Sequence, residues 1–151
     1  MITTSISPTK LSRAAPLALL LLISGSLYAQ QPMSISLKGD AEVPPVTTSA
    51  SGTGQFTVLA ERMVSGSIKT LGMAPTVAHI HEAAAGKNGP PIITLSKTSN
   101  DSFVVPAGAK LTEAQYTSFV AGNLYVNVHS NQHPEGEIRA QLPGKPMRIA
   151  N

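Results

Sequence analysis

Short segments in which polar and apolar residues alternate recur along this chain, and turn-forming residues separate them. Alternation with a period of two is typical of a strand that buries one face. The segments lie at 34–39, 52–59, 64–71, 77–82, 92–95, 102–105, 124–130 and 136–142. Because no helical periodicity alternates with them, the pattern predicts an all-β fold, either an antiparallel β-sandwich or a Greek-key barrel.

One short helix is expected in the connection that precedes the segment 124–130. Thr112 followed three residues later by Gln115 is the pattern of a capping box at a helix N-terminus. Apolar residues such as Phe119 recur with helical spacing after it, and Gly122 is a suitable C-terminal stop. We therefore predict a helix of about two to three turns.

Residues 1–29 have the order of a secretory signal peptide. Lys10 and Arg13 precede an apolar run at 14–23, and small residues lead to Ala29. This run is shorter than the roughly 20 apolar residues that span a bilayer. We expect cleavage after Ala29, export to the periplasm or the medium, a single domain at 34–142, a tail at 143–151 and no membrane span in the mature chain.

The charge and the cysteine content narrow the function classes. Without Lys10 and Arg13, nine basic and eight acidic residues remain, a net charge of +1. No basic stripe is visible and aromatic residues are few, so we expect no nucleic-acid partner. The chain has no cysteine. An exported domain without disulfides must be stabilised by its own core.

The four histidines of the chain all lie in two segments. His79 and His81 alternate along 77–82, while His129 and His133 lie in 124–142. Strand alternation places His79 and His81 on one face, and His129 on the polar face of its own strand. If these strands are neighbours, the histidines share one surface on the polar, outward side of the sandwich.

Such a surface predicts a transition-metal site. Two histidines at positions i and i+2 of a strand have Cα atoms about 6.5–7 Å apart, so both rings can reach one ion. Imidazole suits copper and zinc. We expect copper, with zinc as the second choice, bound by His79, His81 and His129, with His133 as a fourth ligand.

An alternative without metal remains open. The histidines can instead hold the loops 86–91 and 131–135 through hydrogen bonds, with Glu137 and Arg139 in a surface ion pair. The protein would then be an extracellular module that binds another protein. A copper-dependent redox enzyme is the third hypothesis. No nucleophile, acid–base pair or phosphate loop marks the chain as an enzyme.

The chain resembles the CHRD domain family, named after chordin, over about residues 34–142. The resemblance rests on short motifs that occur in the order of the family. They are Leu37-Lys38-Gly39, Glu42-Val43-Pro44-Pro45-Val46, Ala78-His79-Ile80-His81, Asn88-Gly89-Pro90, Leu124-Tyr125-Val126-Asn127-Val128-His129 and Gly136-Glu137-Ile138-Arg139-Ala140-Gln141-Leu142. The chain departs from the family at 82–84, where members often have Gly-Pro. The resemblance implies a stand-alone exported module, and the comparison with chordin implies an extracellular protein partner.

The segment around His79 and His81 is also similar to the copper strand of copper–zinc superoxide dismutases, which are β-sandwiches too. This similarity implies that His79, His81 and His129 are copper ligands. The zinc-loop histidines, the disulfide and the active-site arginine segment of those enzymes have no counterpart in this chain. Superoxide dismutation is therefore not implied.

Overall fold

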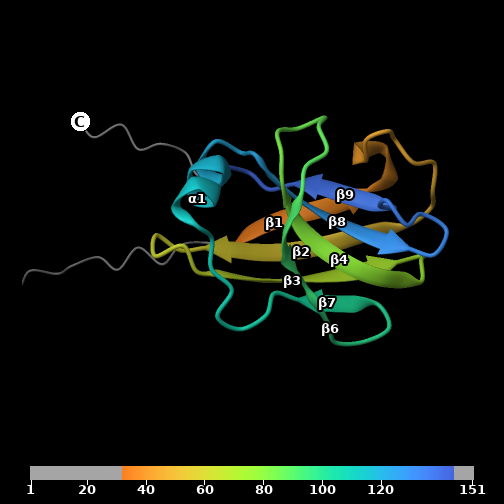
Figure 1. Cartoon of the computed structure of the whole chain (residues 1–151). Helices are drawn as coiled ribbons and strands as arrows, with labels where there is room; N and C mark the ends of the chain where they lie inside the picture. Colours follow the sequence, from red (N-terminus) through yellow and green to blue (C-terminus); the bar gives the residue numbers. More distant parts are fainter. Residues whose placement is uncertain (1–31, 145–151) are drawn as a thin grey trace, which may run out of the picture.

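The computed structural model describes residues 32–144 as an antiparallel β structure with one α-helix (Figure 1). The strands are β1 (Met33–Lys38), β2 (Ser51–Val58), β3 (Val64–Leu71), β4 (Pro75–Glu82), β5 (Pro91–Thr94), β6 (Ser96–Lys97), β7 (Ser102–Val104), β8 (Leu124–Ser130) and β9 (Ile138–Gln141). The predicted all-β fold class is confirmed. The expected signal peptide, residues 1–29, and residues 145–151 of the expected tail lie outside the described residues.

The strands form one sheet in the order β5-β4-β8-β9-β1-β2-β3-β7-β6. The sheet is nearly divided in two, because β1 and β9 share only the pair Lys38 and Arg139. In Figure 1, β8 and β9 lie above β2 and β3. Between β5 and β6, the Leu95 N–H donates to the Ala78 carbonyl at 2.9 Å. The chain thus passes from one end of the sheet to the other, and apolar side chains from both halves form one core.

Alternation explains most of the strands but not β8. Buried and exposed positions alternate in β2 and β3, as the sequence pattern predicts. In β8, however, all seven residues are buried, including its polar positions. The polar face of this strand is therefore covered, and the expectation that it points outward is wrong. Strand β9 is also shorter than predicted, because it begins at Ile138 rather than at residue 136.

The helix α1 (Glu113–Val120) begins and ends as predicted. The Thr112 hydroxyl accepts from the Gln115 N–H at 3.2 Å, and the Gln115 side chain accepts from the Thr112 N–H at 2.9 Å. Phe119 anchors the helix in the core with 1% of its surface exposed. Between residues 32 and 144, no helix has the length and apolar character needed to cross a membrane.

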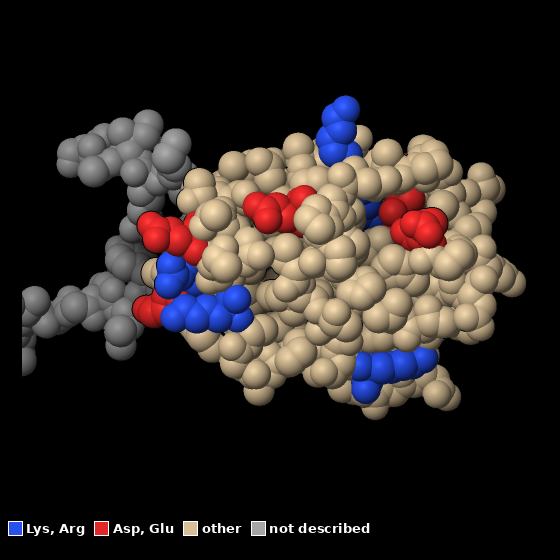
Figure 2. All heavy atoms as spheres, viewed as in Figure 1, with Lys and Arg blue, Asp and Glu red and all other residues tan. Residues whose placement is uncertain are grey.

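Charged side chains are scattered over the face drawn in Figure 2. At the left end of this view basic side chains lie beside acidic ones, and the other basic side chains stand apart among uncharged surface. This face therefore carries no continuous basic stripe.

Candidate metal centre

The register of three neighbouring strands brings the polar positions together. Strands β4 and β8 are adjacent and place His79 opposite Asn127. Strands β8 and β9 place Arg139 opposite Asn127 on its other side. His81 and His129 lie two residues along from His79 and Asn127, on the same face. Asn127 is therefore at the centre of this patch, and the expectation that the two histidine-bearing segments are adjacent strands is confirmed.

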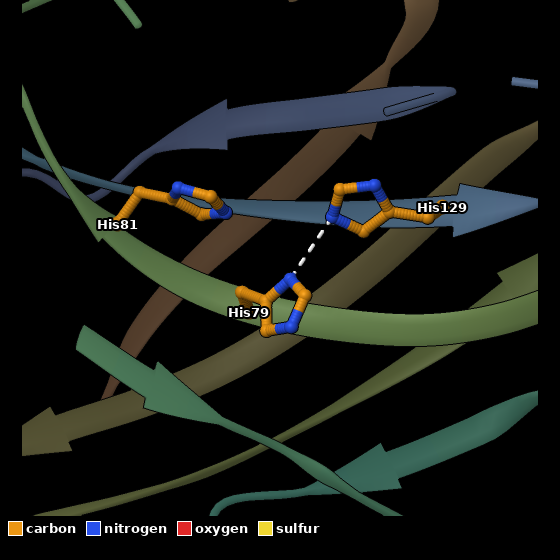
Figure 3. A group of neighbouring side chains, drawn as sticks. All are labelled: His79, His81 and His129. Carbon is orange, nitrogen blue, oxygen red and sulfur yellow. Dashed lines mark hydrogen bonds between the residues drawn. The ribbon is translucent and has the colours of Figure 1, made fainter. Parts of the chain in front are cut away.

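Three of the four histidines converge (Figure 3). One nitrogen each from His79, His81 and His129 lies within 4.8 Å of the others. His79 Nδ1 is 3.0 Å from His129 Nε2. The ring centroids are 5.4 Å apart for His79 and His81, and 4.9 Å apart for His79 and His129. His133 is not part of this group; its backbone instead closes the turn that follows β8.

Two of the converging rings are oriented by backbone carbonyls. His81 Nδ1 lies 2.8 Å from the Gly89 oxygen, and His129 Nδ1 lies 2.9 Å from the Pro134 oxygen. A carbonyl only accepts, so Nδ1 of each ring carries the proton and donates it. In the neutral rings Nε2 then holds a lone pair that faces the other histidines. This is the arrangement in which an outer partner fixes the tautomer of a metal-binding histidine.

Burial disfavours protonation of His79 and His81. It lowers the pKa of His79 to about 4, with further lowering from the neighbouring His129 and His81. Burial also lowers the pKa of His81, against the opposing effect of the hydrogen bond to Gly89. Removing a charged group from water disfavours its charged form, which for histidine is the protonated one. At neutral pH both rings therefore retain an unprotonated nitrogen that can bind a metal.

The three converging imidazole nitrogens can bind one metal ion after a small side-chain rotation. Two nitrogens that each bind one ion at about 2.0–2.1 Å are at most about 4.2 Å apart. The 3.0 Å pair satisfies this limit, while a spread of up to 4.8 Å across the group requires a small side-chain rotation. His79 Nδ1 must also lose the proton that it donates to His129 Nε2. Imidazole donors in this number suit copper or zinc.

A loop covers the patch. Arg139 donates to the Lys87 carbonyl at 2.7 Å and to the Asn88 side chain at 3.1 Å, and its guanidinium carbon lies 3.4 Å from the centre of the Tyr125 ring. The ring of His81 stacks on the same tyrosine at 4.8 Å. Residues 83–90 thus close over β8 and β9, which explains why the polar face of β8 is buried.

The interpretation of Glu137 and Arg139 as a surface ion pair is wrong. Only 4% of Glu137 and 2% of Arg139 is exposed. Glu137 accepts a hydrogen bond of 2.8 Å from the Thr48 hydroxyl, while Arg139 contacts the loop 83–90. Within residues 32–144, the one ion pair joins Lys69 and Asp101 at 4.0 Å. Arg139 is therefore a structural residue of the site.

Sequence reasoning missed Asn127 and Glu42 as residues of the site. Alternation places Asn127 on the same face as Tyr125 and His129, but nothing in the sequence assigned it a role in the site. Glu42 lies in the connection between β1 and β2, far from the other residues in sequence, and no local pattern identifies it. Its side chain is buried, and its Oε1 has no hydrogen-bond partner.

Burial raises the pKa of Glu42 to about 7, although Arg139 and Asn127 lower it in part. A raised pKa stabilises the fold below the unfolded value of 4.5, and this contribution is lost as the pH rises through 7. The depressed pKa of His79 acts in the opposite direction, because its stabilising contribution is lost as the pH falls from 6.5 towards 4. Between about pH 4.5 and 6.5 the two contributions oppose each other.

Glu42→Gln removes the pH-dependent contribution of Glu42 to stability and leaves that of His79. We expect the difference in unfolding free energy, variant minus wild type, to rise by about 1–2 kcal/mol between pH 4.5 and pH 7.5. Urea unfolding of both proteins at four pH values in this range measures it. A difference that stays constant with pH would contradict the assignment of the raised pKa to Glu42.

The fold and the site define an all-β module in which a loop partly covers a cluster of three histidines. Residues 33–142 match the CHRD domain family. The match covers most of the chain, so the protein belongs to the CHRD domain family, as the sequence resemblance predicted. Neither a curated protein nor a solved structure gives a significant match to the chain.

Proposed function

We propose that this CHRD module is exported and binds one transition-metal ion, copper in preference to zinc, through His79, His81 and His129. The observation that carries the proposal is the convergence of three imidazole nitrogens within 4.8 Å, two of them on rings fixed by backbone carbonyls. Export rests on the order of charged, apolar and small residues in 1–29.

The chemistry of the donors supports this assignment. The low pKa of His79 means that protons compete with a metal only in acid. In His81 and His129 the loop carbonyl is bound through Nδ1 and the cluster is approached through Nε2, so holding a loop and binding a metal are compatible roles for the same histidine. His133 lies outside the cluster, so the proposed set has three protein ligands.

The test uses the one histidine of the cluster that no loop carbonyl holds. In His79→Gln a ligand is lost while the bonds from His81 and His129 to the loops remain. We expect the mature wild-type protein to bind one copper(II) ion in calorimetric titration with glycine as competitor. His79→Gln should bind it at least about 100-fold more weakly, since each ligand contributes roughly 3–4 kcal/mol to such a site.

His133→Gln is the matched control and should bind copper like the wild type. Saturating copper should also raise the melting temperature of the wild type and of His133→Gln, because an ion that binds only the folded state stabilises it. Equal copper affinity in the wild type and in His79→Gln would disprove the proposal.

The metal-free interaction module is the second candidate. The hydrogen bonds from His81 to Gly89 and from His129 to Pro134 favour it, because they hold loops without any ion. On this hypothesis the loops 83–90 and 131–136 form the surface that a protein partner contacts. Stoichiometric copper that binds only at exposed sites, with no dependence on His79, would favour this candidate over the first.

A further inference from the structure

Three buried polar atoms without a partner gather beside the histidine cluster. In the part of the chain that the structure describes, the buried side-chain nitrogens and oxygens with no hydrogen-bond partner are Glu42 Oε1, His81 Nε2 and Asn127 Oδ1. Each such atom destabilises the fold if it stays unpaired. Their grouping in one place indicates that something is bound there.

Asn127 connects the three atoms. Its amide acts on both the Glu42 carboxyl and the His81 ring, as the shifts in their pKa values reflect. A Cβ atom built on Gly136 would lie 2.6 Å from Glu42 Oε1 and 2.8 Å from Asn127 Nδ2. The side chains of Glu42 and Asn127 therefore meet against this glycine.

Two of the three unpaired atoms are hydrogen-bond acceptors. His81 Nδ1 donates to Gly89, so His81 Nε2 holds a lone pair, and Asn127 Oδ1 is a carbonyl oxygen. These two acceptors need a cation, a hydrogen-bond donor or both. The metal proposed above would occupy His81 Nε2, but Asn127 Oδ1 would still need a donor. Three protein ligands also leave a coordination position for an external ligand, as in catalytic zinc sites.

We propose that the metal centre holds a small protic ligand, with water as the simplest case, and that Asn127 orients this ligand by accepting its hydrogen bond. This inference rests on the proposed function. The ligand must be small, because the unpaired atoms are inaccessible from outside. His79 is the one member of the cluster that is only half-buried. Ligands that carry an O–H or N–H group should bind better than aprotic anions.

The test compares Asn127→Leu, which keeps the approximate size but has no acceptor, with Asn127→Asp, which keeps a carboxyl oxygen. The probes are copper(II) alone, the relaxation of water protons around the copper-loaded protein, and titration with azide followed by electron paramagnetic resonance. Wild-type protein should show the excess relaxation of an exchangeable bound water. In Asn127→Leu, azide should displace water about tenfold more readily, because water loses one hydrogen bond. Asn127→Asp keeps an acceptor for the water, so azide should displace water no more readily than in the wild type.

The outcomes separate this inference from the proposed function. Wild-type protein that binds no stoichiometric copper would overturn both. Stoichiometric copper without an exchangeable water, measured on the wild type alone, would overturn the bound protic ligand and leave the three-histidine site intact. Equal azide affinity in copper-loaded wild type and Asn127→Leu would overturn the role of Asn127. If Asn127→Leu does not fold, the relaxation of the wild type still decides whether a water is bound.

Discussion

Arg139→Leu is expected to lower the free energy of unfolding by about 3 kcal/mol, which corresponds to a fall in melting temperature of roughly 12 °C for a domain of this size. Arg139 is 2% exposed and donates to the Lys87 carbonyl and the Asn88 side chain. Its guanidinium also lies over the Tyr125 ring at 3.4 Å. Leucine fills part of the volume, but it leaves the loop acceptors without a donor and removes the contact with the ring.

Arg139→Leu should loosen the loop 83–90 in addition to lowering the stability of the whole domain. Because Arg139 holds Lys87, its replacement should free the loop 83–90, and trypsin should then cleave after Lys87 faster than in the wild type. Arg139→Lys keeps the charge but not the planar fork, so it should fall between the two proteins. Thermal unfolding and limited proteolysis measure both effects.

Lys69→Ala is the control for Arg139→Leu, because it removes an exposed basic side chain instead of a buried one. Its ammonium is 4.0 Å from Asp101, and 73% of its side chain is exposed. An exposed ion pair of this kind contributes little to stability, so the variant should melt close to the wild type. If Arg139→Leu also melts within about 3 °C of the wild type, the buried guanidinium does not hold the loop.

The strands could be predicted from sequence because their signal is local. Alternation along β2, β3 and β4 and the capping box at Thr112 are properties of neighbouring residues. The same alternation correctly placed His79 and His81 on one face. That β4 and β8 lie side by side was an assumption, since residues 77 and 129 are far apart in the chain; the register of the two strands confirms it.

The burial of the site could not be predicted in the same way. Alternation shows which residues of a strand are polar, and polar residues are usually exposed. Asn127 and His129 are polar but buried, because loops and neighbouring strands surround them. Those partners are distant in sequence. Arg139 is held by residues 51 and 52 positions earlier, and Glu42 is brought to Asn127 by the connection after β1. The sequence shows which residues are polar, whereas the topology decides what covers them.

Gly89→Ala is the second substitution with a large expected effect. A Cβ atom at residue 89 would collide with the carbonyl oxygen of Glu82 and would also lie 2.9 Å from the Ala83 side chain. The first obstacle is backbone, so the loop must move rather than a side chain. We expect a loss of about 2–3 kcal/mol in unfolding free energy.

The movement should also reach the metal centre, because the Gly89 carbonyl accepts the 2.8 Å hydrogen bond that orients His81. Loss of such an outer partner typically weakens metal binding by about 10–100-fold. We therefore expect Gly89→Ala to combine a lower melting temperature with weaker copper binding, measured by thermal unfolding and calorimetry.

Gly86→Ala is the matched control in the same loop. Gly86 has a φ of +74°, and nothing lies within 4 Å of a Cβ built there. Alanine at this position costs about 1–2 kcal/mol for its left-handed backbone but has no steric reason to displace the Gly89 carbonyl. Gly86→Ala should therefore bind copper like the wild type, and only Gly89→Ala should lose affinity. Equal copper affinities in the two variants would show that the Gly89 carbonyl does not orient His81, and that the loop stabilises the fold without acting on the histidines.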